Sequence, residues 1–185
     1  MQDLAPRRAT YADLEAAPPN RVAELIDGQL VTMPRPTPRN MNAVSGLGYF
    51  LQGPFHRGIR GPGGWWIIDE PEIHLGEDVV VPDLAGWRRE RMPELPTIAF
   101  FSLAPDWICE VLSPSTARYD RGAKRDIYAR HCVSHYWLLD PAQELLEVFD
   151  LMDGKWLLQR TYRDGDTVAM PPFDAAPFEL AQLWV

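Results

Sequence analysis

The sequence predicts an α/β fold in which helices flank a central mixed sheet. Its 185 residues suit one domain with a sizeable core. Short apolar runs with the composition of strands alternate with segments whose apolar residues recur at helical spacing. The 18 prolines and 13 glycines indicate many short elements rather than a few long helices. We therefore expect a single domain over residues 1–185.

The first part of the chain predicts a short helix, a hairpin and a longer helix. Residues 10–13 form a capping-box variant, and the helix that they start would stop at Pro18-Pro19. Asp27-Gly28 separates two apolar runs, which is a hairpin signal. After a proline-broken loop, Asn40 or Asn42 would cap a helix with one apolar stripe. The stripe consists of Ala43, Val44, Leu47, Phe50 and Leu51.

The middle of the chain is rich in strand residues. The runs WWIIDEPEIHL (residues 65–75) and DVVVPDLAGW (residues 78–87) have the β-branched and aromatic composition of strands. Residues 87–105 predict a long irregular connection with room for one short helix. The run 107–112 predicts a short buried strand between flanking prolines.

The C-terminal part predicts one longer helix, then strands, then a short helix. The helix is expected over roughly residues 119–131, and the run SHYWLLD after it has strand composition. A hairpin should follow, turning at Asp153-Gly154. The final run FELAQLWV predicts a last short helix.

Composition limits where and how the protein works. No apolar run suits a signal peptide or a membrane span. Cys109 and Cys132 form neither a CxxC pair nor a disulfide framework, so a reducing cytoplasm is the expected location. The net charge of −8 argues against nucleic-acid binding through a globally basic surface, although it leaves room for a local basic cleft.

Three acidic residues stand among apolar strand neighbours: Glu24, Asp83 and Glu110. Side chains alternate along a strand, so Glu110 shares its face with Ile108 and Leu112. An ionised carboxylate there is costly unless it is paired or bound to a cation. Any one of the three could simply accept hydrogen bonds from a backbone amide or an arginine. If all three converge, oxygen ligands without a Cys or His cluster point to Mg²⁺ or Mn²⁺.

The helix after Glu110 carries Asp120, Lys124 and Tyr128 on one stripe. Taken alone, the spacing predicts an exposed Asp–Lys pair worth a few tenths of a kcal/mol. Ile127 and Tyr128 favour the other interpretation, in which this edge of the helix faces the sheet. Asp120 could support Lys124 from behind the site or simply be its surface partner, and we favour the surface partner. We interpret Tyr128 as a packing residue.

These residues form a pattern that resembles a known nuclease motif. Pro82-Asp83, followed by a strand carrying Glu110, is similar to the PD-(D/E)xK motif, except that Leu112 stands where lysine is usual. A known variant places the lysine on the following helix, where this chain has Lys124. The ordered set over about residues 10–185 resembles the Uma-type family of restriction-endonuclease-like proteins. It comprises residues 24–28, 82–83, 110–116, 120/124/128, 136–141 and 146–149.

The resemblance implies a restriction-endonuclease-like fold with additional hairpins and a metal-dependent endonuclease activity on nucleic acid, with DNA as the expected substrate. Asp83 and Glu110 would bind Mg²⁺ or Mn²⁺, with the Val111 carbonyl as a further ligand. Glu24 would complete the acidic metal site. Lys124 would orient or help activate the attacking water and stabilise charge growing on the phosphate. A homodimer is expected.

One departure from the family supports a rival interpretation. Family members usually carry a histidine where this chain has Asn40, which would reduce activity if that histidine supports the site. The rival is a catalytically inactive homodimeric module that binds or regulates while retaining the nuclease fold. A metal-dependent hydrolase of a small phosphoester is a third alternative, and it would need a closed pocket rather than a groove.

Other residues are candidates for contacts with nucleic acid. Trp87, beside two arginines, is the tryptophan we expect at such a contact, whereas the others in strand runs should be core. His131 and His135 lack the further ligands that a zinc site needs. Six arginines could line a phosphate-binding cleft: Arg88, Arg89, Arg91, Arg118, Arg121 and Arg125.

Overall fold

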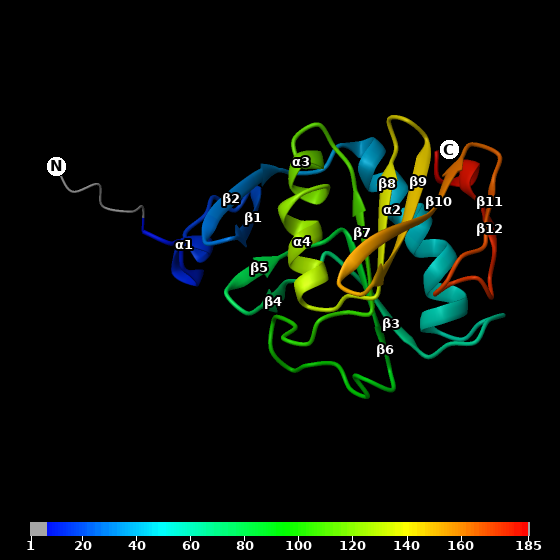
Figure 1. The fold of residues 1–185 in the computed structure, drawn as a ribbon, viewed down its shortest axis with the longest axis horizontal. Coiled ribbons are helices and arrows are strands. Elements are labelled where there is room, and N and C mark those ends of the chain that lie inside the picture. Colours follow the sequence, from blue (N-terminus) through cyan, green and yellow to red (C-terminus); the bar gives the residue numbers. More distant parts are fainter. Residues whose placement is uncertain (1–6, 185) are drawn as a thin grey trace.

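A mixed six-stranded sheet forms the centre of the molecule (Figure 1). The computed structural model describes residues 7–184. The sheet has the order β10-β9-β8-β7-β6-β3; β7 and β8 are parallel, and the other neighbours are antiparallel. Its strands are β3 (Trp65–Asp69), β6 (Leu84–Arg88), β7 (Trp107–Val111), β8 (His135–Asp140), β9 (Leu145–Met152) and β10 (Lys155–Arg163). The predicted fold class, a central mixed sheet flanked by helices, is confirmed.

A second, four-stranded sheet has the order β2-β1-β5-β4. Its strands are β1 (Arg21–Ile26), β2 (Gln29–Pro34), β4 (Ile73–Leu75) and β5 (Asp78–Val80). The predicted hairpin joins β1 to β2, and both turn residues, Asp27 and Gly28, have positive φ (50° and 78°). Positive φ at both positions is the mark of the tight turn whose twist matches that of the strands.

Two expected strand runs are each divided between the two sheets. The run 65–75 leaves β3 and continues in β4, while the run 78–87 passes from β5 into β6. Pro82 lies where the chain passes from β5 to β6, and it has no N–H that could form a hydrogen bond to a neighbouring strand. We had expected Asp83 to lie within a strand, but it precedes the first residue of β6.

Helices cover both faces of the main sheet. They are α2 (Pro38–Leu51), which continues into a π-helix (Gln52–His56), α3 (Ala117–Asp120) and α4 (Ala123–Arg130). The short helix α1 (Tyr11–Glu15) lies instead against β1 of the second sheet. In α1 the predicted capping box is present, since the Thr10 amide donates to Asp13 Oδ2 at 2.7 Å. The predicted cap of α2 was wrong. Thr37 caps this helix by accepting from the Asn40 amide, and Pro38 occupies the first turn.

The helix expected over residues 119–131 is broken into α3 and α4 at Arg121-Gly122. A Cβ on Gly122 would lie 2.8 Å from the Arg118 carbonyl oxygen, so the chain can pass this point only as glycine. The break gives α4 a new start, and its buried stripe consists of Lys124, Ile127 and Tyr128.

The two faces of the main sheet bury different clusters. Along β7, Trp107, Cys109 and Val111 pack with α2, whereas Ile108 packs with α4 and the β1–β2 hairpin. Alternation places Glu110 on the same face as Ile108. Glu110 is therefore directed at α4, the helix that carries Lys124, and Figure 1 shows α4 lying over this face.

The C-terminal part contains the predicted hairpin and a shorter helix than expected. The β9–β10 turn at Asp153-Gly154 has positive φ at both residues. Beyond it, β11 (Thr167–Val168) pairs with β12 (Phe178–Glu179), and a 3₁₀ helix spans Leu180–Leu183. No helix forms between β6 and β7. None of the helices within residues 7–184 is long and apolar enough to cross a membrane.

Candidate active site

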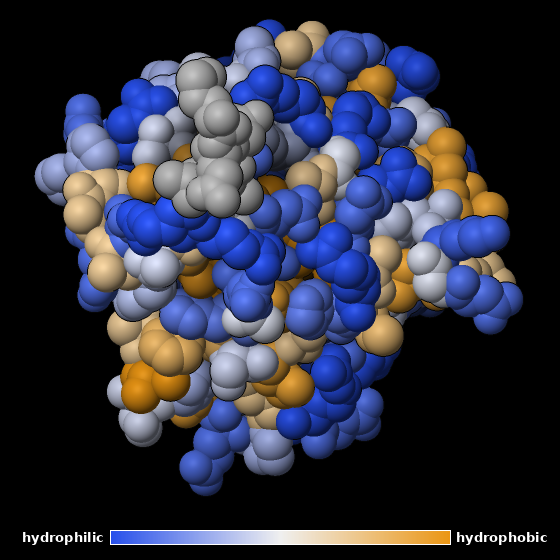
Figure 2. All heavy atoms as spheres, turned by 60° about the vertical axis from the view of Figure 1, so that its left-hand side comes forward, coloured by the Kyte–Doolittle hydropathy of each residue, from blue (hydrophilic) through white to orange (hydrophobic). Residues whose placement is uncertain are grey.

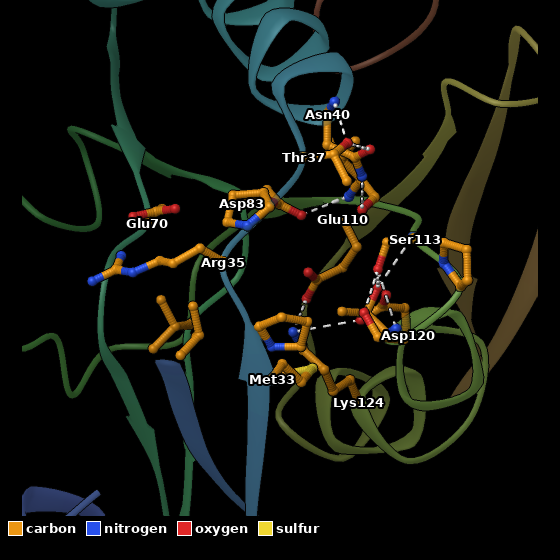
Figure 3. A pocket seen from close by; sticks show the side chains of 18 residues that line it. Met33, Arg35, Thr37, Asn40, Glu70, Asp83, Glu110, Ser113, Asp120 and Lys124 are labelled. Carbon is orange, nitrogen blue, oxygen red and sulfur yellow. Dashed lines mark hydrogen bonds and ion pairs between the residues drawn. The ribbon is translucent and has the colours of Figure 1, made fainter. Parts of the chain in front are cut away.

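A cavity of about 200 Å³ lies where β7 ends, between the main sheet, the β2–α2 connection and the start of α4. Four acidic and two basic residues are among those that line it (Figure 3). These are Glu70, Asp83, Glu110 and Asp120, with Arg35 and Lys124. The sequence-predicted residues Asp83, Glu110, Val111 and Lys124 therefore share one cavity, although they come from three separate segments of the chain.

Asp83 is positioned by the end of β7. In the β6–β7 register Leu84 faces Cys109, so Asp83 stands opposite Glu110. Its Oδ2 accepts the Val111 amide at 2.7 Å. Burial raises the pKa of Asp83 from its usual 3.8 to about 7, even though this hydrogen bond and Lys124 act to lower it. Near neutral pH the carboxyl therefore exchanges readily between its protonated and ionised forms.

Glu110 points from β7 toward α4. Its Oε1 lies 2.7 Å from Lys124 Nζ and accepts a 2.5 Å hydrogen bond from the Tyr128 hydroxyl. Burial raises the pKa of Glu110 well above its usual value, and the repulsion from Asp120, Asp83 and Glu24 adds to this, although Lys124 opposes it.

Lys124 is enclosed by carboxylates. Besides Glu110, its Nζ lies 3.0 Å from Glu24 Oε1 and 3.6 Å from Asp120 Oδ1. Only 2% of the lysine side chain is exposed, and the acids that it contacts are as deeply buried. Burial by itself would lower the pKa of Lys124, but Glu110, Glu24 and Asp120 outweigh it and raise the pKa. The lysine is therefore held as an ammonium ion. Our interpretation of Asp120 as a surface partner was wrong.

Glu24 lies behind Lys124, at the second sheet. Its Oε1 accepts the Val81 amide at 2.7 Å in addition to contacting Lys124. Its Oε2 is buried and has no hydrogen-bond partner among residues 7–184. Glu24 is not among the residues that line the cavity, so its contact with the site passes through Lys124.

Tyr128 does more than pack. Replacing it with phenylalanine leaves the Glu110 carboxylate with one donor fewer in a buried position. We expect Tyr128→Phe to lower the free energy of unfolding by about 1–3 kcal/mol. Urea denaturation measures the difference, with Tyr49→Phe as a control because the Tyr49 side chain is 78% exposed. Equal unfolding midpoints for Tyr128→Phe and wild type would contradict this role.

Asn40 binds the backbone at the end of β7. Its Nδ2 donates to the carbonyls of Leu112 (3.0 Å) and Val111 (3.3 Å), while its Oδ1 accepts from the Thr37 hydroxyl. The Val111 carbonyl, which we expected to be a metal ligand, is thus already in contact with a donor. A carbonyl oxygen has a second lone pair, so this contact does not prevent it from binding a cation.

Two charged lining residues, Arg35 and Glu70, were not considered in our sequence-based site. Glu70 extends the β3–β6 ladder, since its amide donates to the Asp83 carbonyl at 3.1 Å. Figure 3 shows Arg35 and Glu70 on the side of the cavity away from Asp120. Our signal was an acid between apolar neighbours on one strand face. Glu70 lies in the run 65–75 but has Glu72 as one such neighbour, and Arg35 lies in the proline-broken loop. The Thr37-Pro38 pair, a cap followed by proline, is a signal that could have placed the start of α2 and the loop before it.

Six arginines could have lined a phosphate-binding cleft, and two of them, Arg88 and Arg89, line a cavity other than this one. None of the six lines the cavity. Arg91 pairs with Asp106, and Arg121 pairs with Glu147. Arg89 donates to backbone carbonyls and stacks over Trp66. The expectation for Trp87 was also wrong, because its ring is fully buried and its Nε1 donates to the Leu103 carbonyl.

The donor set can be tested against the needs of a metal ion. Among residues 7–184, no group of three or more His, Cys, Asp or Glu side chains is arranged to hold one. Asp83, Glu110 and Val111 are among the lining residues and can offer two carboxylates and a backbone carbonyl. This set fits Mg²⁺, which is usually held by one or two carboxylates and completes its shell with water and substrate oxygens.

Comparisons with known proteins support the nuclease-like fold. Residues 8–181 match the Uma2 family, described as "Putative restriction endonuclease". The chain is also similar to a solved structure of a "putative nuclease belonging to DUF820" from Anabaena variabilis, with a TM-score of 0.73 and 20% identity. That similarity covers 95% of this chain and 97% of the other. No curated protein matches significantly. Because the family match spans nearly the whole sequence, the chain belongs to the Uma2 family of restriction-endonuclease-like proteins.

Proposed function

We propose that the protein is a divalent-metal-dependent endonuclease that hydrolyses phosphodiester bonds of nucleic acid, with DNA as the expected substrate. The observation that carries the proposal is the position of Lys124. This residue stands on a separate helix, yet it lies in one cavity with Asp83 and Glu110, 2.7 Å from the latter. Two acids and a lysine at one site are what phosphodiester hydrolysis requires for binding a cation and neutralising developing charge.

Asp83, Glu110 and the Val111 carbonyl are the groups that would hold Mg²⁺ or Mn²⁺. When bound, the cation would stabilise negative charge that develops on the phosphate. Glu110 would bind through Oε2, because Oε1 is already shared between Lys124 and Tyr128. We had proposed Glu24 for the metal as well; its contacts now favour a role in holding Lys124.

Lys124 would act as a fixed positive charge. Its pKa is raised by the carboxylates around it, so it cannot serve as the base that removes a proton from water. As an ammonium ion it can donate hydrogen bonds that orient the attacking water and the phosphate oxygens. Glu24 and Asp120 would keep its stem and charge in place.

The excess of acidic over basic residues at the cavity would make a bound cation necessary for substrate binding. With four carboxylates lining the cavity, a phosphate would be repelled in the absence of metal. On the face seen in Figure 2, hydrophilic residues predominate and apolar residues form only small separate patches. Nucleic acid would therefore be recognised locally, at the cavity and its rim.

One observation also fits the rival function, an inactive binding or regulatory module. Lys124 forms ion pairs with the acids around it, and all of them are almost fully buried, as in a purely structural ion cluster. Such a cluster would stabilise the fold without binding metal. The two functions differ in what Mg²⁺ or Mn²⁺ does to the protein.

A cleavage assay tests the proposed function. Purified protein is incubated with single-stranded DNA, duplex DNA and RNA in Mg²⁺, in Mn²⁺ and in excess chelator. We expect metal-dependent cleavage of at least one polymer and none with chelator. Failure to cleave any polymer in either metal, by protein that is folded, would favour the inactive module.

A further inference from the structure

A second cavity of about 250 Å³ adjoins the site. It lies between the end of α1, the Pro18-Pro19 segment and β1. Four residues line both cavities: Val22, Arg35, Glu70 and Val81. The two spaces are therefore neighbours, and together they extend the site from the carboxylates toward the N-terminal helix.

Arg35 stands at the junction of the two cavities. Its Nη2 makes a long hydrogen bond, 3.4 Å, to the carbonyl of Pro19, which itself lines the second cavity. Within residues 7–184 the guanidinium forms no salt bridge. Lys124, the other cation that lines the first cavity, is already ion-paired with Glu110 and Glu24. Arg21 also lines the second cavity and forms no salt bridge within residues 7–184, but its guanidinium donates to the side chain and carbonyl of Thr32. Arg35, which lines both cavities, is therefore the cation at their junction that can meet an anion.

The second cavity has a lining of apolar and charged residues. Much of its lining is apolar, including Leu14, Ala17, Pro18 and Pro19. Two acids are also present. Glu72 is occupied, since it accepts from the Tyr11 hydroxyl at 2.8 Å and lies 2.7 Å from His74 Nε2. Glu70 lines both cavities, as Arg35 does, but forms no ion pair with it within residues 7–184.

We propose that Arg35 binds the phosphate next to the scissile one, and that the second cavity accepts the nucleotide between these two phosphates. This inference rests on the proposed function and defines the substrate further. A base can enter a cavity of this kind only when it is unpaired, so the strand is bound single-stranded or locally opened. Two adjoining cavities also favour a polymer over the small phosphoester that we had considered.

The test measures binding of a short fluorescein-labelled oligothymidylate by fluorescence anisotropy, with Ca²⁺ in place of Mg²⁺ to limit cleavage. Arg35→Ala should weaken binding by about tenfold or more, because one charge-assisted phosphate contact is lost. In Arg35→Ala the plot of log affinity against log salt concentration should become less steep by about 1. Arg35→Lys should restore much of the affinity and of the salt dependence. Arg39→Ala is the matched control, since Arg39 lies nearby, pairs with Glu144 and lines neither cavity.

A second variant tests the nucleotide pocket itself. Ala17→Trp would fill the second cavity from the surface, and we expect it to weaken binding without changing the salt slope, because no charge is removed. Thermal unfolding of each variant confirms that it is folded. Wild-type affinity and slope in Arg35→Ala, or wild-type affinity in a folded Ala17→Trp, would overturn the inference.

The proposed function can fail separately. Hydrolysis of bis(p-nitrophenyl) phosphate by the wild type reports the chemistry of the carboxylate site without any nucleotide. If the wild type hydrolyses this ester but does not bind the oligothymidylate, the inference fails and the hydrolytic function stands. If the wild type does neither, both fail.

Discussion

Asp83→Asn is expected to remove metal-dependent cleavage while making the metal-free protein more stable above neutral pH. The amide cannot supply the anionic ligand that the cation needs, so the cleavage rate should fall by at least about 10²-fold. Its oxygen can still accept the Val111 amide, so the local fold is kept. Cleavage rates and urea denaturation of the two proteins measure the two effects.

The gain in stability follows from the raised pKa of Asp83. An acid whose pKa rises from 3.8 to about 7 on folding binds its proton more tightly in the folded state. Its contribution to stability is therefore full below the lower pKa and is lost as pH rises toward the upper one. Asp83→Asn has no such loss, so above pH 7 it should be more stable than wild type by about 2–4 kcal/mol.

Asp69→Asn is the control for the loss of cleavage. Asp69 ends β3 and is not among the residues that line the cavity. It should leave cleavage unchanged. Equal stability of Asp83→Asn and wild type at both pH 5 and pH 8 would show that burial does not disfavour the ionised carboxyl of Asp83. This result would contradict our description of the site.

Lys124→Ala is expected to lower the free energy of unfolding by about 3–5 kcal/mol near pH 8. The substitution leaves Glu24, Glu110 and Asp120 buried without their shared cation. The deficit should shrink as pH falls, because protonation of the carboxyls removes their mutual repulsion. Denaturant titrations at pH 5 and pH 8 measure this change.

Lys155→Ala serves as the control, since Lys155 is exposed at the start of β10. The double substitution Lys124→Met with Glu24→Gln should recover part of the lost stability, because it removes one of the stranded charges. A Lys124→Ala variant as stable as Lys155→Ala at pH 8 would mean that the buried ion cluster contributes nothing to the fold.

The central part of the site could be predicted from the sequence. Alternation along β7 directs Glu110 to the same face as Ile108, and the family resemblance pointed to Lys124 on the next helix. The hairpin turns at Asp27-Gly28 and Asp153-Gly154 were also predictable, because these dipeptides favour positive φ. Such signals are local, and each acts within a few residues.

What could not be predicted depends on contacts between distant segments. The burial of Asp120 requires the helix break at Gly122 and the hairpin that brings Glu24 over α4. The position of Arg35 depends on how the β2–α2 connection passes between the two sheets. Spacing along the sequence contains no information on either, so Asp120 was assigned to the surface and Arg35 was not considered.

The measurement that tests the central claim most directly is calorimetric titration of chelator-treated protein with Mn²⁺, alone and with a short oligothymidylate. We expect saturable binding by the wild type that is lost in Asp83→Ala and Glu110→Ala and retained in Asp69→Ala. The oligonucleotide is included because its phosphate oxygens can supply ligands. Absence of binding by the wild type under both conditions, or equal binding by Asp83→Ala, would contradict the claim that these acids form a metal site.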